Sequence, residues 1–306
     1  MRTRWECILL VTVAVVTRGQ GVCWTYITAG NKTDGFGAQL QSKVSCILEA
    51  KSHAHSMSYV HVPFFEMEHE NLGASISELE AVTNLGYGEL HSVDLPEGVE
   101  VEERRMCHNW GDSHPHLYEL LRADLVRKMH SGRHKDAHAK ALSQSTCSAA
   151  EVCVAVHIRR GDVQGGDRFL PNEHFSDIID GIIQGLQDHD LSARISVYSE
   201  GAEADFEDIP FQEERGITLH LDEPMLEAWL SLIGADILVT SHSSFSYSAG
   251  LYNEGLTVYS EFWHSPLPSW ITYHDSAQLA RALSQQHVGI QLRKRMAGRL
   301  ARPESI

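Results

Sequence analysis

The 306-residue sequence has no apolar run of the length that a bilayer requires. Its N-terminal run, Cys7–Val16, has ten residues, about half of the roughly 20 that a membrane-spanning helix needs. Lysine is scarce, with 7 Lys beside 18 Arg, and the net charge of −16 lacks the basic excess typical of nucleic-acid-binding proteins. Low-complexity segments are also missing, which excludes a disordered or fibrous chain.

The six cysteines show no CxxC pair and no zinc-ligand spacing. One or two disulfides would suit an oxidising compartment, and the sequence leaves their connectivity open. Cys153 lies inside an apolar run, and we expect it to be a buried thiol.

The N-terminus has the organisation of a secretory signal. Basic residues precede the apolar run, and small residues follow it up to Gly21. We expect residues 1–21 to be a signal peptide or short signal-anchor, although a buried first strand is an alternative. Asn31 begins a glycosylation sequon. The expected location is the Golgi or ER lumen, with the protein anchored by its N-terminus or secreted.

The length and the order of elements predict two α/β domains. Residues 22–150 begin with a strand at 24–29, a helix at 38–53 and a strand at 59–63, which is typical of a parallel sheet. Residues 72–112 look irregular, and an amphipathic helix is expected over 116–129, before a polar linker at 131–151.

Residues 151–306 alternate strands and helices more regularly. Strands are expected at 152–158, 194–198, 217–221, 237–240 and 256–259, and helices at 172–187, 203–209, 224–234, 244–253 and 276–300. Two Rossmann-like domains that face each other across a cleft would place a ligand at the carboxyl ends of their strands.

A His-Ile-Arg-Arg-Gly-Asp motif follows the expected strand at 152–158. Arg159 and Arg160 would repel each other unless an anion or carboxylates neutralise them, and a diphosphate fits because arginine binds it with two parallel hydrogen bonds. Gly161 permits a sharp turn. A structural pair between arginine and Asp162 is an alternative, and an Arg-Gly-Asp adhesion tripeptide is another.

A second motif, Thr-Ser-His-Ser-Ser-Phe-Ser at 240–246, follows a strand and opens a helix. Ser243, Ser244 and Phe245 would lie at the helix N-terminus, where hydroxyl and N–H groups bind anions. Simple N-capping by serine is the alternative.

A third motif surrounds Gly35 and Gly37, directly after the first strand, and includes Gln39. The third glycine of a dinucleotide fingerprint is missing. The second strand also ends without a ribose-binding acid, so NAD is not expected.

Together, these motifs resemble the GT-B-fold fucosyltransferase superfamily, which includes α1,2-, α1,6- and protein O-fucosyltransferases. Residues 157–162 look like its HxRRxD signature, and residues 235–246 are similar to its last motif. The resemblance spans about residues 24–260. It implies an inverting enzyme that transfers fucose from GDP-fucose to a glycan or glycoprotein, with donor binding in residues 151–306.

The resemblance also implies roles for single residues. Arg159 would contact the β-phosphate with help from Arg160, and His157 would lie near the base or ribose. Ser243 and Ser244 would bind phosphate, and Phe245, Gly161, Gly35, Gly37 and Gln39 belong to the same donor-binding motifs. Glu200 stands where the superfamily often has an acid. Asp167, ten residues past His157, is the expected general base, with Asp162 as a second candidate.

No metal is expected to take part, because arginines and helix N–H groups would stabilise the leaving diphosphate. Asp188-His189-Asp190 matches a metal-binding DxD pattern but follows a helix, so we interpret it as a solvated turn. Alternatives are a GT-B transferase that uses another nucleotide sugar and a catalytically inactive protein that binds GDP-sugar or glycan.

Overall fold

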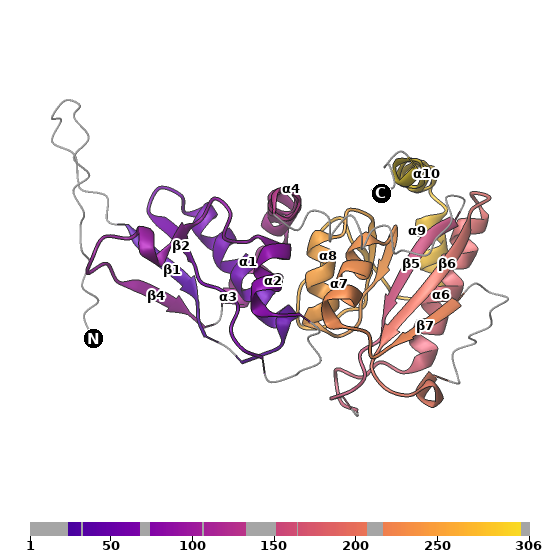
Figure 1. Cartoon of the computed structure of the whole chain (residues 1–306). Helices are drawn as coiled ribbons and strands as arrows, with labels where there is room; N and C mark the ends of the chain where they lie inside the picture. The colour runs from indigo at the N-terminus through magenta and orange to yellow at the C-terminus, as the bar shows by residue number, and fades with distance from the viewer. Residues whose placement is uncertain are drawn as a thin grey trace.

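A computed structural model of the chain describes residues 24–31, 33–67, 74–105, 107–132, 151–163, 165–206 and 217–300. Two parallel β-sheets form the framework, one from each half of the chain (Figure 1). The expected α/β fold, with two Rossmann-like sheets and a cleft between the halves, is confirmed. The expected signal segment and most of the linker lie outside the described residues.

The first sheet has the strand order β3-β2-β1-β4. Its strands are β1 (Thr25–Ala29), β2 (Met57–His61), β3 (Leu90–His91) and β4 (Val101–Arg104). The helices of this half are α1 (Phe36–Ser52), α2 (Ile76–Thr83), α3 (Cys107–Asp112) and α4 (Pro115–Ser131). Ser75 caps α2 through a reciprocal capping box with Glu78.

The second sheet has the strand order β10-β9-β8-β5-β6-β7. Its strands are β5 (Glu151–His157), β6 (Ser192–Ser199), β7 (Ile217–Leu221), β8 (Ile237–Val239), β9 (Leu256–Tyr259) and β10 (Ile271–Thr272). Its helices are α6 (Asn172–Gln187), α7 (Met225–Gly234), α8 (Ser244–Tyr252), α9 (Ser276–Leu283) and α10 (Gln286–Leu300).

The order of this sheet is that of a doubly wound fold. The chain starts in the middle with β5, adds β6 and β7 on one side, and then returns to add β8, β9 and β10 on the other. Ligands of such folds bind outside the carboxyl ends of the strands where the order reverses. Here that point lies between β5 and β8, which are hydrogen-bonded neighbours.

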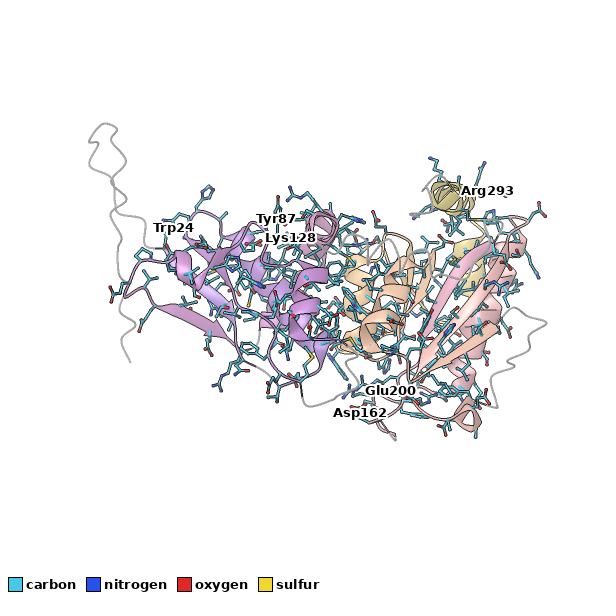
Figure 2. The ribbon with its side chains drawn as sticks, viewed as in Figure 1. Trp24, Tyr87, Lys128, Asp162, Glu200 and Arg293 are labelled. Atoms are coloured by element: carbon cyan, nitrogen blue, oxygen red, sulfur yellow. The ribbon has the colours of Figure 1, made fainter. Side chains whose placement is uncertain are left out.

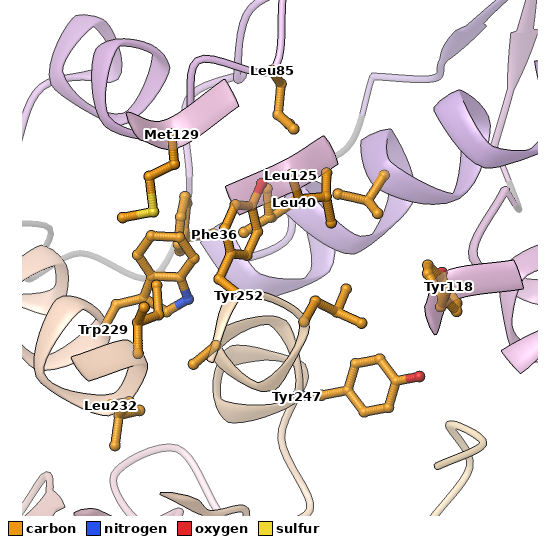
Figure 3. Packing of buried hydrophobic residues seen from close by; sticks show 14 of the residues in the cluster. Phe36, Leu40, Leu85, Tyr118, Leu125, Met129, Trp229, Leu232, Tyr247 and Tyr252 are labelled. Carbon is orange, nitrogen blue, oxygen red and sulfur yellow. The ribbon is translucent and has the colours of Figure 1, made fainter. Parts of the chain in front are cut away.

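One apolar core joins the two halves of the chain. Phe36 on α1 meets the Trp229 ring of α7 edge-on at 5.1 Å, and Trp229 meets Tyr252 of α8 at 5.3 Å. Figure 3 shows these rings together with Leu40, Leu125 and Met129 of the first half. Because burying such side chains contributes about 1.5–3 kcal/mol each, the interface behaves as a core rather than as a hinge.

Gly37 brings the two halves into backbone contact. A Cβ atom at this position would lie 2.5 Å from Cα of Phe245 and closer still to its backbone nitrogen. The missing side chain lets the first turn of α1 approach the N-terminus of α8. Gly35, by contrast, has open space where a Cβ would be and an ordinary φ of −60°.

Three expectations about the elements were wrong. Residues 72–112 are not irregular where they are described, because α2, β3, β4 and α3 lie there. The helix expected over 276–300 is two helices, α9 and α10. The first part of the helix expected over 203–209 is a short 3₁₀ turn at Glu203–Phe206, and the rest lies outside the described residues.

The expectation that Cys153 is a free thiol was also wrong. Cys46 of α1 and Cys153 of β5 are both disulfide-bonded. Both residues are buried, so an apolar environment alone did not distinguish a thiol from a disulfide. In the described part of the chain, no helix is both long enough and apolar enough to cross a bilayer.

Substituting Gly37 with alanine tests the contact between the halves. The new methyl group would meet backbone atoms of α8, and overpacking of this kind costs about 1–3 kcal/mol. Gly37→Ala should therefore lower the free energy of unfolding by that amount in urea titrations. Gly35→Ala is the matched control and should change it by less than about 0.5 kcal/mol. Equal effects of the two substitutions would contradict the contact.

Candidate functional site

A cavity of about 660 Å³ lies between the two halves of the chain. Its walls come from the loop between β1 and α1, from the residues that follow β5, β6, β7 and β8, and from Trp263 and His264 after β9. All of these follow the carboxyl ends of parallel strands, as the fold leads one to expect. Most of the residues predicted from the sequence line this cavity: Gly35, Gly37, His157, Arg159, Arg160, Asp162, Glu200, Ser243, Ser244 and Phe245.

Arg159 lies where β5 opens into the cavity. One terminal nitrogen of its guanidinium donates to both carboxylate oxygens of Asp162, at 2.6 and 2.7 Å, and the other lies 3.5 Å from Oγ of Ser243. Its backbone N–H donates to Oγ of Ser241. The arginine that follows β5 and the helix start that follows β8 therefore lie next to each other.

The carboxylate of Asp162 is bound to the guanidinium of Arg159. Because both of its oxygens accept hydrogen bonds from Arg159, it orients the guanidinium and is poorly placed to take a proton from a substrate. Asp167 is exposed and is not among the lining residues; its backbone carbonyl lies 2.7 Å from Nδ1 of His242. Of the two expected bases, Asp162 therefore lies in the cavity but is bound to Arg159, and Asp167 lies outside the cavity wall.

Arg160 has a different role from its neighbour. Its guanidinium contacts Oδ1 of Asn172 and the carbonyl oxygen of Arg159, and it lies 4.2 Å from the centroid of the Phe169 ring. The side chain is buried, and this burial lowers the pKa of Arg160. These contacts hold the loop that follows β5, so Arg160 stabilises the site rather than offering its charge to a ligand.

Arg168 is the third arginine of the cavity wall, after Arg159 and Arg160. Its guanidinium lies 5.8 Å from the centroid of the Trp263 ring, and no hydrogen bond or ion pair joins it to any residue that the structure describes. Burial, together with the nearby charge of Arg159, lowers the pKa of Arg168. Two close guanidiniums with one carboxylate between them favour an anionic ligand.

His157 is the last residue of β5 and is buried against the cavity. Its ring lies 5.2 Å from that of Phe245, and its Nδ1 atom has no hydrogen-bond partner among the described residues. Burial, followed by the charges of Arg159 and Arg160, lowers the pKa of His157 to about 3. The imidazole is therefore neutral at physiological pH, and it can donate a hydrogen bond to a ligand or accept one from it.

The N-terminus of α8 forms the part of the wall next to Arg159 and His157. Ser243 is the N-cap, and its hydroxyl accepts from the backbone N–H of Phe245 at 3.3 Å. The hydroxyl of Ser244 lies 3.1 Å from Nε2 of His264. Both serines cap or position the helix, as the simpler interpretation predicted, and both also line the cavity.

Gln39 lies behind the site rather than in it. It is buried and is not among the lining residues. Its amide nitrogen donates to the carbonyl oxygen of Asp34 at 2.9 Å, and its amide oxygen accepts from the backbone N–H of Phe65 at 2.9 Å. Gln39 therefore ties the end of β1 to the end of β2 and positions Asp34.

Gly161 is required by the turn and by Glu200. Its φ of +71° lies in the left-handed region that favours glycine. A Cβ atom at this position would collide with Oε2 of Glu200. Figure 2 shows Glu200 and Asp162 at the same end of the second sheet. Gly161 itself is not among the lining residues.

The ends of β6 and β7 carry a stacked pair of rings in the cavity wall that sequence reasoning missed. Tyr198 and His220 are stacked, with ring centroids 4.7 Å apart and an interplanar angle of 13°. Nδ1 of His220 lies 2.7 Å from Oε1 of Glu223. Asp222 also lines this end of the cavity. The position of these residues after two parallel strands was the one signal that could have found them.

Asp34 and His264 were missed as well. Asp34 lines the cavity from the first half, directly before the glycine motif. His264 lies 2.9 Å from Oδ2 of Asp112 and within hydrogen-bond distance of Gln41, both in the first half of the chain. No spacing in the sequence relates His264 to Asp112, because they are 152 positions apart.

No group of three or more metal-ligating side chains occurs within the described ranges. Asp188 of the DxD pattern accepts from the hydroxyl of Ser284, and His189 contacts the carbonyl oxygen of Leu283. Both lie outside the cavity wall.

No protein-family model and no curated protein matches the chain. Among solved structures, POFUT1 in complex with GDP aligns with a TM-score of 0.41 and 13% identity, over 81% of this chain and 98% of that one. E. coli heptosyltransferase WaaC with ADP-2-deoxy-2-fluoro heptose aligns at 0.36 and 14%, over 85% and 98%. The wall teichoic acid polymerase TagF aligns at 0.33 and 11%, over 83% and 65%. Likeness at this level assigns no function to the chain.

The low pKa of His157 predicts a pH dependence of stability. Above about pH 6.5 the ring is neutral in both folded and unfolded chains, and it contributes no slope. Below that pH the unfolded chain binds a proton that the folded chain excludes down to about pH 3, so stability falls by about 1.4 kcal/mol per pH unit.

The variant His157→Gln removes this titration. Between pH 6 and 4, its free energy of unfolding, measured in urea, should fall less steeply than that of the wild type. The exposed His287 serves as the control, and His287→Gln should keep the wild-type slope. If His157→Gln also keeps it, the ring is not buried in its neutral form.

Proposed function

We propose that the protein is a metal-independent, inverting glycosyltransferase that transfers fucose from GDP-fucose to a glycan or glycoprotein. The observation that carries the proposal is the meeting of Arg159 with the N-terminus of α8 at the point where the strand order reverses. A helix N-terminus and a guanidinium together favour the two negative charges of a diphosphate. Arg168 adds a third positive group to the same wall.

The layout of the cavity supports a nucleotide whose base lies at the β6 and β7 end. Tyr198 and His220 offer flat rings there, and Glu200, Asp222 and Glu223 bring carboxylates to the same end. Guanine presents N1–H and an amino group on one edge, and a carboxylate can accept from both. Uracil presents a single N–H on its corresponding edge. The acidic lining therefore favours GDP over UDP.

The transfer requires the leaving diphosphate to be stabilised. The acceptor oxygen attacks C1 of the sugar, the bond from C1 to the phosphate oxygen breaks, and its electron pair stays on the diphosphate. Arg159 and the first turn of α8 face that developing charge, and removing one such donor typically costs about 10²–10³ in rate. Asp162 keeps Arg159 oriented for this role.

The acceptor must also lose a proton, and Asp34 is best placed to take it. Of the carboxylates that line the cavity, Asp162 is bound to Arg159, and Glu200, Asp222 and Glu223 lie at the β6 and β7 end. Asp34 lines the cavity from the first half of the chain, directly before the first turn of α1 that contacts α8. Inversion at C1 requires the acceptor to attack from the side opposite the leaving group, with its proton passing to this carboxylate.

We further propose that the protein acts in the lumen of the secretory pathway. The N-terminal signal pattern and the sequon at Asn31 support this location. The disulfide-bonded state of Cys46 and Cys153 also suits an oxidising compartment.

The proposal predicts selective binding of GDP. GDP should raise the melting temperature more than UDP at equal concentration, and EDTA should leave the shift unchanged. Arg159→Ala should weaken GDP binding by about 10–100-fold in calorimetric titrations, because it removes a charge-assisted hydrogen bond. Arg194, which pairs with Glu151 at the opposite end of the sheet, serves as the control, and Arg194→Ala should bind as the wild type does.

A larger shift with UDP would indicate another nucleotide sugar, and an EDTA-sensitive shift would overturn the metal-independent mechanism. Binding of GDP without any cleavage of GDP-fucose would indicate an inactive binding protein.

The assignment of Asp34 predicts a separate effect. Asp34→Asn should lower transfer, or the slower hydrolysis of GDP-fucose by water, by about 10²–10⁴-fold, because it removes the general base. GDP affinity should change less than threefold, which titration of the variant would show. Asp177→Asn alters an exposed carboxylate on α6 and should have no effect on either quantity. Unchanged turnover by Asp34→Asn would contradict the role given to Asp34.

A further inference from the structure

Trp263 is an unusual part of the cavity wall because it is both exposed and fixed. Its side chain is 53% exposed, whereas the other aromatic residues of the wall are buried or half-buried. Its indole N–H donates to Nε2 of His264 at 3.0 Å, and its ring packs against Phe262 with centroids 4.9 Å apart. The flat ring is therefore held in one orientation with much of its surface open.

His264 connects Trp263 to the first half of the chain. The indole N–H of Trp263 donates to Nε2 of His264. Nδ1 of the same ring lies 2.9 Å from Oδ2 of Asp112 and 2.9 Å from the side-chain nitrogen of Gln41. The amide of Gln41 donates to the other oxygen of Asp112 at 3.3 Å. A chain of hydrogen bonds therefore runs from Trp263 through the buried His264 to α3 and α1.

The location of Trp263 separates it from the proposed nucleotide end. Trp263 follows β9, whereas the stacking pair Tyr198 and His220 belongs to β6 and β7. Three strand spacings separate β9 from β6, which is about 14 Å at about 4.8 Å each. Arg159 follows β5 and Ser243 follows β8, so both lie between the stacking pair and Trp263. The tryptophan thus lies beyond the diphosphate-binding residues.

We propose that Trp263 is the platform of an acceptor subsite that binds the pyranose ring of a saccharide. A pyranose has a face made of C–H bonds, which packs on an indole, and a rim of hydroxyls. Asp34 and Arg168 in the same wall offer polar partners for those hydroxyls. A peptide acceptor fits less well at Trp263, because the edge strand that contributes to the lining, β7 through His220, lies at the other end of the sheet.

This inference rests on the proposed function, and it names the acceptor class that the proposal leaves open. The network behind Trp263 is the observation that carries it. Polar groups such as the buried His264 and the half-buried Asp112 are expensive to remove from water unless they are hydrogen-bonded. Here His264 holds the exposed ring of Trp263 in its orientation, and Asp112 of the first half holds His264.

An array of immobilised glycans, probed with the full chain saturated with GDP, tests the subsite. The array carries glycans that end in galactose, glucose, N-acetylglucosamine or mannose, together with unglycosylated peptides. The wild type should bind at least one glycan class and none of the peptides. Trp263→Ala should lower that binding at least tenfold, and Trp263→Phe should restore most of it. Tyr87→Ala alters an exposed aromatic residue outside the cavity and should bind as the wild type does.

Thermal shifts with GDP and with GDP-fucose separate the possible failures. If the wild type is not stabilised by GDP, the proposed function itself is wrong. If GDP binds but no glycan does, or only peptides do, or Trp263→Ala binds glycans normally, the acceptor subsite is overturned. It is also overturned if Trp263→Ala weakens GDP-fucose binding tenfold relative to GDP, because the ring would then hold the transferred sugar.

Discussion

The contact of Gly37 with the first turn of α8 is the constraint on which the rest of the site depends. It brings the N-terminus of α1 against that of α8, so that the loop carrying Asp34 and the loop carrying Arg159 become walls of one cavity. The shared core around Phe36 and Trp229 holds this approach. The proposed binding and catalytic groups from both halves are therefore preorganised, and their alignment does not depend on a large closing motion.

The proposed anion site is compatible with an acidic chain. The net charge of −16 belongs to the whole chain, whereas Arg159, Arg168 and the start of α8 determine the local charge of the cavity wall. The guanidinium of Arg160, the second arginine of the motif, is instead held by its contacts with Asn172 and Phe169. Arg159 therefore lies next to the start of α8, whereas the adjacent Arg160 holds the loop that follows β5.

Much of this organisation could be predicted from the sequence, because periodicity and strand ends are local properties. The buried strand 152–158 and the serine-rich helix start placed Arg159 and Ser243 correctly relative to the sheet. The pairing of Asp162 with Arg159 is also local, and it was one of the interpretations of the motif. The role of Gln39 could not be read in this way, since it depends on a partner that the fold supplies. Gln39 bonds to Phe65, 26 positions away, and the contact of His264 with Asp112 spans half the chain.

The proposed general base illustrates the same limit. A carboxylate at a set distance from the motif histidine suggested Asp167, yet that residue is exposed outside the cavity wall, and Asp34 lies inside it. Sequence spacing measures distance along the chain, whereas a base is selected by its distance from the acceptor. The side chains that bridge the two halves are therefore the ones that only the three-dimensional structure reveals.

The central claim is that a diphosphate binds between Arg159 and the N-terminus of α8, and a crystal structure of the complex with GDP tests it most directly. The account predicts the β-phosphate within hydrogen-bond distance of the Arg159 guanidinium and the backbone N–H groups of α8, with the guanine ring at Tyr198 and His220. A diphosphate bound elsewhere, or a nucleotide that leaves Arg159 in contact with Asp162 alone, would contradict it.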